Sequence, residues 1–283
     1  MGKLILGMEI VLIENYSVTE WFAFLFIYSF LGWCIESTIV SVSKRKLTNR
    51  GFLTGPFLPI YGFGAITILL STLWVRENIL LVYVCGMIAA TCLEYVTGVL
   101  MEQIFCMRYW DYSDKKFNLN GYICLKSSLF WGVLSVVLVS VIHIPIAAFL
   151  KTVPAWLLNM SLVLFTAIGI VDAAFAFKNA LDFGKLLTYE TRLRKELAEL
   201  KEHISEMKTK LAGKATRKQI KYIAKQEKKL QKLVAELNHV KSRIWRFNME
   251  WLKSFPSATS AKFSEVLEET KVHINIKKKS KKL

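Results

Sequence analysis

The sequence predicts an all-α protein: a polytopic membrane bundle of five transmembrane helices, followed by a cytoplasmic helical hairpin or coiled coil. Apolar residues make up 53% of the chain although 21% of it is charged. The two kinds are segregated. Up to Phe177 there are 11 Lys and Arg against 10 Asp and Glu, and after it there are 27 against 12. A nearly neutral apolar part and a strongly basic part indicate two regions in different surroundings.

Five apolar stretches predict the transmembrane helices. Each is close to the roughly 20 residues that cross a bilayer as a helix. They run over residues 18–42, 57–75, 79–105, 127–149 and 155–177. We therefore assign residues 1–177 to a transmembrane domain in contact with membrane lipid.

Basic residues in the connections orient these spans. The only basic residues in the second and fourth connections are Arg76 and Lys151. The first and third are more basic, and they contain Lys44, Arg45, Lys46 and Arg50, and then Arg108, Lys115, Lys116 and Lys126. Because Lys and Arg accumulate on the cytoplasmic side, we predict that the N-terminus lies outside and the C-terminal tail in the cytoplasm.

Carboxylates within the apolar spans indicate a functional site. Glu36, Glu94 and Asp172 lie inside spans, and Glu102 and Asp111 follow at one edge. A charged side chain at mid-bilayer costs about 2.5 to 3.5 kcal/mol on insertion scales, so such residues usually face a protein interior or a polar cavity. Small residues at helical spacing, which favour close packing, accompany two of the acids. They are Ser29 and Gly32 for Glu36, and Gly86, Ala90 and Gly98 for Glu94.

Two interpretations of these acids stay open. In the functional one, which we favour for Glu36 and Glu94, the acids line a cavity that faces the cytoplasm, together with Arg50 and Tyr61. In the structural one, each acid is held by a Trp, Tyr, Ser or main-chain group, or is protonated because charge is costly away from water. For Glu102 and Asp172 the two interpretations are evenly matched.

The first connection, residues 49–64, is rich in Gly and Pro. Gly55 followed by Pro56 predicts a helix start, because proline is tolerated in the first turn of a helix. Amides at that start, together with Arg50, would form a site for a phosphate, a carboxylate substrate or one of the protein's own glutamates. The alternative is an ordinary tight turn.

The third connection combines an interfacial aromatic residue with an acid. Trp110 suits the membrane interface, and the Asn-Leu-Asn-Gly run at residues 118–121 predicts a turn. Asp111 has two interpretations. It either meets Arg50 or closes the mouth of a cavity, or it caps a turn beside the aromatic anchor.

Several motifs follow one another in a distinctive order. They are Gly32-Trp33 with Glu36; Asn49, Gly51, Gly55, Pro56, Pro59, Tyr61 and Gly62; Glu94 with Gly98 and Glu102; and Trp110-Asp111-Tyr112-Ser113 with Asn118 and Gly121 to Leu125. Over about residues 18–132 the sequence resembles the bacterial ABC-transporter type IV membrane proteins, the CmpB-like family. The resemblance implies a multi-pass protein of the bacterial inner membrane with a transport-related, permease-like role. It implies no substrate and no catalytic residue.

Other chemistries are not indicated. Residues 213–216, Gly-Lys-Ala-Thr, lack the upstream glycine and the hydroxyl directly after lysine that a phosphate loop needs, so ATP hydrolysis would come from a separate subunit. The four histidines and five cysteines have no metal-ligand spacing, and we expect no metal, no cofactor and no catalytic site. An intramembrane enzyme that uses Glu36 and Glu94 as a carboxylate pair ranks third, after transport and scaffolding.

Apolar residues after the last span alternate spacings of four and three, which is the seam of a coiled coil. The seam predicts a helical hairpin over residues 178–253, with arms of about 50 Å at 1.5 Å per residue. Residues 254–283 would form a basic, flexible tail. The seam could pair within the chain, between two copies of the chain or with a partner protein. As an alternative to transport, the membrane bundle would anchor the hairpin as a scaffold that recruits a partner. We expect no nucleic-acid partner, because no reading motif accompanies the basic charge.

Overall fold

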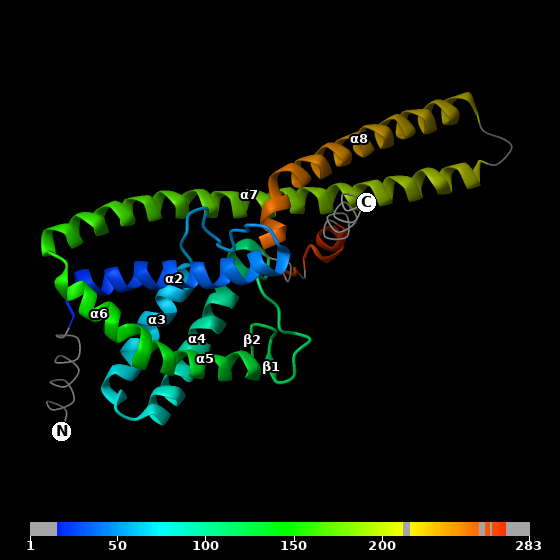
Figure 1. The fold of residues 1–283 in the computed structure, drawn as a ribbon. Helices are drawn as coiled ribbons and strands as arrows, with labels where there is room; N and C mark the ends of the chain where they lie inside the picture. Colours follow the sequence, from blue (N-terminus) through cyan, green and yellow to red (C-terminus); the bar gives the residue numbers. More distant parts are fainter. Residues whose placement is uncertain (1–15, 212–215, 255–257, 261, 270–283) are drawn as a thin grey trace, which may run out of the picture. The chain divides into compact units, whose positions relative to one another are not determined.

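The computed structural model describes residues 16–211, 216–254, 258–260 and 262–269, and it is 80% helical (Figure 1). The chain divides into two compact units. Unit 1 comprises Met1–Ile104 and Arg108–Lys178, and unit 2 comprises Phe105–Met107 and Asn179–Leu283. Of the basic, flexible tail predicted over residues 254–283, residues 255–257, 261 and 270–283 lie outside the described residues.

Helices and one two-stranded sheet make up the described chain. The helices are α2 (Val18–Lys44), α3 (Pro59–Thr72) with the 3-10 turn η1 (Leu73–Val75), α4 (Ile79–Phe105), α5 (Leu125–Val137), the π-helical turn η2 (Leu138–Ile142), α6 (His143–Thr152), α7 (Ala155–Lys210) and α8 (Arg217–Ser254). The strands β1 (Asn118–Leu119) and β2 (Ile123–Cys124) pair antiparallel.

Four of the described helical stretches are long and apolar enough to cross a membrane. They are Val18–Lys44, Ile79–Phe105, Leu125–Thr152 and the first part of Ala155–Lys210. The predicted second span corresponds to the shorter helical stretch Pro59–Val75. Its 14 α-helical and three 3-10 residues give about 25 Å, less than the roughly 30 Å hydrocarbon core of a bilayer. The second of the five predicted spans therefore stays a prediction.

Both ends of α2 are fixed by local contacts. The Ser17 side chain accepts a hydrogen bond from the main-chain amide of Glu20 at 3.2 Å, and the Glu20 carboxylate accepts one from the Ser17 amide at 2.6 Å. This reciprocal arrangement satisfies amides that have no partner within the helix. At the other end Arg45 adopts a left-handed conformation with φ 49°, which stops the helix and lets the chain turn back.

Close approach of α2 and α3 organises the core of unit 1. A Cβ atom added at Gly32 would lie 2.3 Å from the Tyr61 ring, and one added at Gly62 would lie 2.4 Å from the Leu25 carbonyl oxygen. These two helices can therefore pack at this distance only because glycine leaves room at the crossing. Fully buried side chains such as Phe24 and Leu69 complete the core.

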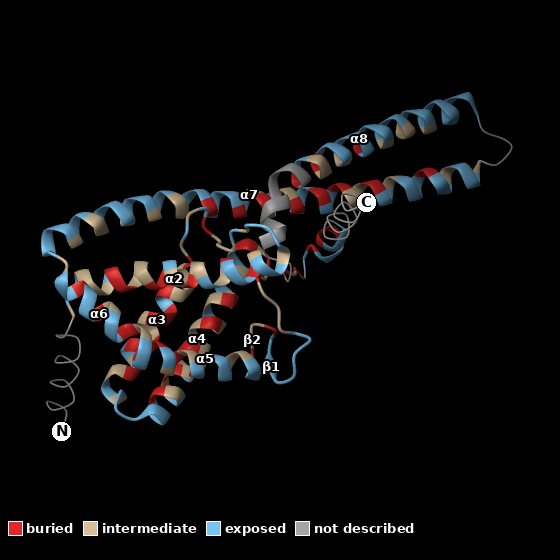
Figure 2. Cartoon of the chain, in the orientation of Figure 1, coloured by how far each residue is buried: buried red, intermediate tan, exposed pale blue. Residues whose placement is uncertain are grey.

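The apolar half of α7 is the least buried of the four candidate membrane spans, and it is mostly pale blue in Figure 2. Only 6% of its most apolar window is buried inside the structure. Large side chains such as Trp156 and Met160 remain exposed. In a protein with membrane-spanning helices, such a surface is suited to face lipid.

Unit 2 is built from the end of α7, from α8 and from residues 262–269. Its core contains Leu193 and Leu197 of the predicted outgoing seam, with Val240 and Ile244 of the return arm. The arms lie side by side: Lys229 pairs with Glu196 at 3.4 Å, and Lys208 with Glu227 at 2.7 Å. Phe263, Val266 and Leu267, which lie in the segment predicted as a flexible tail, join the same core because their apolar side chains are buried there. Whether the arms form a coiled coil stays a prediction.

Candidate functional site

The loop between α2 and α3 is held in shape by one asparagine. The Asn49 side-chain oxygen accepts hydrogen bonds from the Trp33 indole at 2.7 Å and from the Gly51 amide at 2.9 Å. The amide group of Asn49 donates to the Thr54 carbonyl at 2.8 Å. Because a single side chain bridges α2 and two points of the loop, it holds the segment that carries Arg50 beside α2.

The prediction of a helix start at Gly55-Pro56 was wrong by three residues. The Phe57 amide donates to the Gly55 carbonyl at 2.9 Å, which closes a tight turn around Pro56. Helix α3 then begins at Pro59, whose missing N–H costs nothing at the first helical position. The glycine and first proline therefore shape the turn, and the second proline starts the helix.

Glu36 interacts with two side chains from this region. The Tyr61 hydroxyl donates to one carboxylate oxygen at 2.7 Å, and the Arg50 guanidinium lies 3.7 Å from the other. The side chains of Glu36 and Arg50 are 28% and 25% exposed. Of the three anions considered for Arg50, the structure places one of the protein's own glutamates beside it.

Glu94 on α4 is buried and surrounded by hydrogen-bond donors. The Trp131 indole donates to its carboxylate at 2.9 Å, the Tyr112 hydroxyl at 3.3 Å and the Ser127 hydroxyl at 3.4 Å. Ser127 and Trp131 lie four residues apart on α5 and share one helix face. Hydrogen bonds from three neutral donors lower the free energy needed to bury a carboxylate, compared with burial among apolar side chains alone.

Aromatic side chains connect the two acids. The rings of Tyr61, which binds Glu36, and Trp131, which binds Glu94, lie with their centroids 6.0 Å apart. Burial raises the pKa of Tyr112 in the third connection, and the charges of Glu94 and, more weakly, Glu36 raise it further. Glu36 and Glu94 thus belong to one cluster that contains Tyr61, Tyr112 and Trp131. We call it the Glu36–Glu94 cluster.

Glu102 and Asp111 lie in a second group of contacts. The Arg108 guanidinium donates to Glu102 at 2.7 Å and lies 3.9 Å from Asp111. The Tyr122 hydroxyl also donates to Glu102. Asp111 accepts the Ser113 amide at 2.9 Å, which is the turn-capping contact of the structural interpretation.

Two further motif residues position this second group. A Cβ atom at Gly98 would lie 2.9 Å from the Tyr122 ring, so glycine lets that ring pack directly on α4. The Trp110 indole donates to the Tyr122 carbonyl at 2.9 Å. The motif residues of the third connection therefore join the β1–β2 turn to α4.

Asp172 has a role that the sequence left undecided. Its two carboxylate oxygens accept the main-chain amides of Thr54 and Gly55, at 3.0 and 2.8 Å. No sequence pattern indicated these two main-chain partners. Trp131, Ser127 and Tyr112 were not among the predicted cavity residues either. Ser127 and Trp131 lie four residues apart inside an apolar span, and this spacing could have indicated that both face the same polar group.

A buried histidine lies elsewhere in unit 1. The Nδ1 atom of His143 is 2.8 Å from the Tyr28 hydroxyl, and its Nε2 atom is 3.1 Å from the Tyr16 hydroxyl. Its ring also packs on Phe24, with centroids 4.9 Å apart. Among the described residues, no three His, Cys, Asp or Glu side chains are grouped so that they could hold a metal ion.

Comparison with known proteins identifies the family of the chain. Neither the curated proteins nor the solved structures contain a match. A protein-family model, described as "Putative ABC-transporter type IV", matches residues 22–177. The matched segment is more than half of the 283 residues and includes both acids of the Glu36–Glu94 cluster. This chain therefore belongs to the ABC_trans_CmpB family, putative ABC-transporter type IV.

Proposed function

We propose that this chain is the permease-like membrane subunit of an ABC transport system in the bacterial inner membrane. Its N-terminus would lie outside and its hairpin in the cytoplasm. ATP hydrolysis would come from a separate subunit, and the chain would have no catalytic role of its own. The family membership and the apolar helices support the membrane part of this proposal.

The Glu36–Glu94 cluster is the observation that carries the transport role. Two carboxylates from different helices approach one set of aromatic side chains inside an apolar bundle. Intramembrane carboxylates commonly mark substrate or ion pathways. Glu36 is partly exposed and pairs with Arg50 at the long distance of 3.7 Å. We propose that a cavity facing the cytoplasm reaches Glu36 first and Glu94 behind it.

The Glu94→Gln variant tests this role. The substitution keeps the shape of the side chain but removes its charge. Glu77→Gln is the control, because Glu77 is exposed between η1 and α4, away from the cluster. The chain is first purified from its native membrane to identify a co-purifying ATPase, and ATP-dependent solute flux is then measured in proteoliposomes.

We expect Glu94→Gln to reduce the flux while membrane expression and the Glu77→Gln variant stay normal. Equal flux in wild type and Glu94→Gln would remove Glu94 from the mechanism. Absence of any ATPase from the native complex would contradict the ABC assignment.

A scaffold function is the second candidate, and the hairpin of unit 2 supports it. The hairpin has its own apolar core and several ion pairs, yet it follows the segment that the family model matches. Truncation after Phe177 separates the two functions. Loss of a bound partner without loss of flux would favour scaffolding, whereas loss of flux would tie the hairpin to transport.

A further inference from the structure

The two arms of the hairpin pack tightly at its base and loosely at its tip. Leu193, Leu197 and Ile204 are at most 6% exposed on the outgoing arm. Beyond Ile204 the apolar residues of this arm, Met207 and Leu211, are only partly buried. On the return arm, Ile220 is 56% exposed. The apolar seam therefore continues past the point at which the chain itself covers it.

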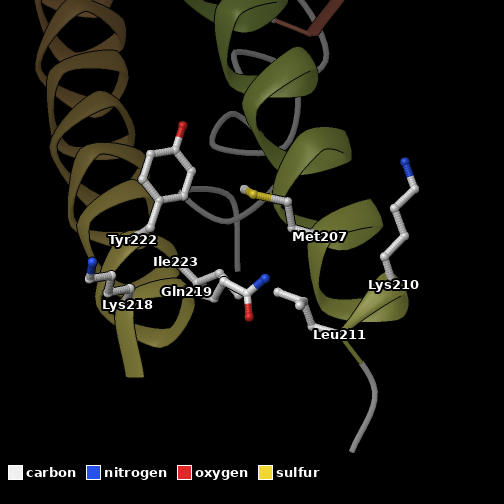
Figure 3. A pocket seen from close by; sticks show the side chains of 7 residues that line it. All are labelled: Met207, Lys210, Leu211, Lys218, Gln219, Tyr222 and Ile223. Carbon is white, nitrogen blue, oxygen red and sulfur yellow. The ribbon is translucent and has the colours of Figure 1, made fainter. Parts of the chain in front are cut away.

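A pocket of about 370 Å³ lies between the arms at this tip. Its apolar lining comes from Met207 and Leu211 of α7 and from Tyr222 and Ile223 of α8. Figure 3 shows the Met207 and Tyr222 side chains extending into the space between the two helices. The volume falls within the roughly 300–1,000 Å³ of pockets that hold drug-sized ligands, so it can admit a large apolar side chain.

Basic residues line this pocket and flank it in the sequence. Lys210 and Lys218 line it directly. Between residues 207 and 226 the sequence contains seven basic residues and no acidic one. Those in the described part of the chain are Lys208, Lys210, Arg217, Lys218, Lys221 and Lys225. Within the described residues, ion pairs are recorded for Lys208 with Glu227 and for Lys210 with Glu206, and none for Lys218, Lys221 or Lys225.

We propose that the hairpin tip binds an acidic amphipathic helix of a partner protein. An aromatic or aliphatic side chain of that helix would enter the pocket beside Tyr222, and its acidic residues would face the basic rim. This arrangement is the helix-in-groove mode of recognition, with charge complementarity that increases the rate and the selectivity of association. The proposal concerns unit 2 alone and does not depend on the transport role of unit 1.

The shape of the site favours a protein over the other anions that a basic surface attracts. An anionic membrane would require an apolar face that projects outward among the lysines. Here Met207, Leu211 and Ile223, which are only partly exposed, instead line a pocket between two helices. Nucleic acid would use the lysines but would leave this apolar pocket empty. A helix with both acidic and apolar residues matches both features.

Fluorescence anisotropy with the purified full chain in phosphatidylcholine nanodiscs tests the proposal. The probe is a labelled amphipathic peptide of about 20 residues, long enough to form a helix, with Phe and Leu on one face and Glu on the other. One control peptide carries Ser in place of the apolar residues, and another carries Lys in place of Glu. Phosphatidylglycerol vesicles and a short DNA duplex are tested as competitors.

Two variants of the chain probe the two halves of the site. Tyr222→Ala removes an apolar lining residue that is 49% exposed, and Lys218→Glu reverses a charge on the rim. Lys185→Glu is the matched charge control, since Lys185 is 77% exposed and far along α7 from the tip. Circular dichroism checks that each variant keeps its helices.

We expect the acidic amphipathic peptide to bind at least about tenfold more tightly than either control peptide. Each tip variant should weaken this binding by about tenfold, as loss of a central contact does, while Lys185→Glu should leave it unchanged. Equal binding of the acidic and Ser-substituted peptides would overturn the proposal. So would binding unaffected by Tyr222→Ala, or complete displacement of the peptide by vesicles or DNA at lower concentrations than unlabelled peptide.

Discussion

Asp172 accepts a hydrogen bond from the main-chain amide of Gly55 at 2.8 Å, across 117 residues of sequence. This contact joins α7 to the loop that carries Arg50. Ring contacts accompany it: Phe57 packs against Phe165 with centroids 6.2 Å apart. Little of the apolar half of α7 is buried, and the loop is one of the parts of unit 1 that contact it.

The first prediction concerns the Asp172→Asn variant. Asparagine keeps one oxygen, so one of the two amides at Thr54 and Gly55 loses its acceptor. A hydrogen bond to a charged group contributes about 1.5–3 kcal/mol, and we expect the free energy of unfolding to fall by a similar amount. Thermal unfolding of the purified chain in detergent measures this change.

The control for this prediction is Asp182→Asn. Asp182 is also on α7, but its side chain is 44% exposed and pairs only with Lys185, at 3.3 Å, among the recorded ion pairs of the described chain. Exposed pairs of this kind contribute about 0–1 kcal/mol. Equal effects of the two substitutions would show that the Asp172 contact with the loop adds nothing to stability.

The second prediction compares two glycines on α3. At Gly62 a Cβ atom would lie 2.2 Å from the Ser29 hydroxyl and 2.4 Å from the Leu25 carbonyl oxygen, which is main chain and cannot rotate away. Gly62→Ala should therefore push α3 from α2 and destabilise the protein by about 1–3 kcal/mol. Thermal unfolding of both variants is the measurement.

Gly64→Ala is the matched control in the same helix. Its added Cβ atom would lie 3.9 Å from Leu93, which is an ordinary contact. Alanine favours helix over glycine by about 0.5–1 kcal/mol, so this variant should be neutral or more stable. A Gly62→Ala protein as stable as Gly64→Ala would mean that α2 and α3 do not meet as closely as described.

Patterns within single helices allowed several features of unit 1 to be predicted from the sequence. The small-residue stripe beside Glu94 indicated close approach of other segments, and the structure places Gly86 against Ser135 and Gly98 against Tyr122. Such periodicity is read directly along one helix, without knowledge of its neighbours. The same reasoning placed Glu94 on an inward face, where it is 6% exposed.

Contacts between distant segments could not be predicted in this way. Glu94 and Trp131 are 37 residues apart, and their hydrogen bond depends on how α4 and α5 meet. The start of α3 was misplaced for a different reason. Pro56 and Pro59 both satisfy the rule for a first helical turn, and the turn closed by Phe57 decides between them.

The last prediction concerns the stability of unit 2 at low pH. Bidentate hydrogen bonds from Arg194, helped by Lys241 at 3.5 Å, hold the pKa of Glu269 at about 2, below its usual value of 4.5. A carboxylate whose pKa is lower in the folded state than in the unfolded state contributes its full stabilisation at a pH above the unfolded-state pKa. We therefore expect this stabilisation to be lost as the pH falls from about 4.5 toward 2, because the unfolded chain then binds the proton more readily.

The Glu269→Gln variant isolates this contribution. It should be less stable than the wild type at neutral pH and should lose less stability between pH 4.5 and 2, so that the two unfolding curves converge in acid. Glu199→Gln is the control, since its exposed carboxylate meets Lys195 only at 4.0 Å. Parallel curves for Glu269→Gln and the wild type across this pH range would contradict the assignment, because the acid sensitivity of unit 2 would then arise from other carboxylates.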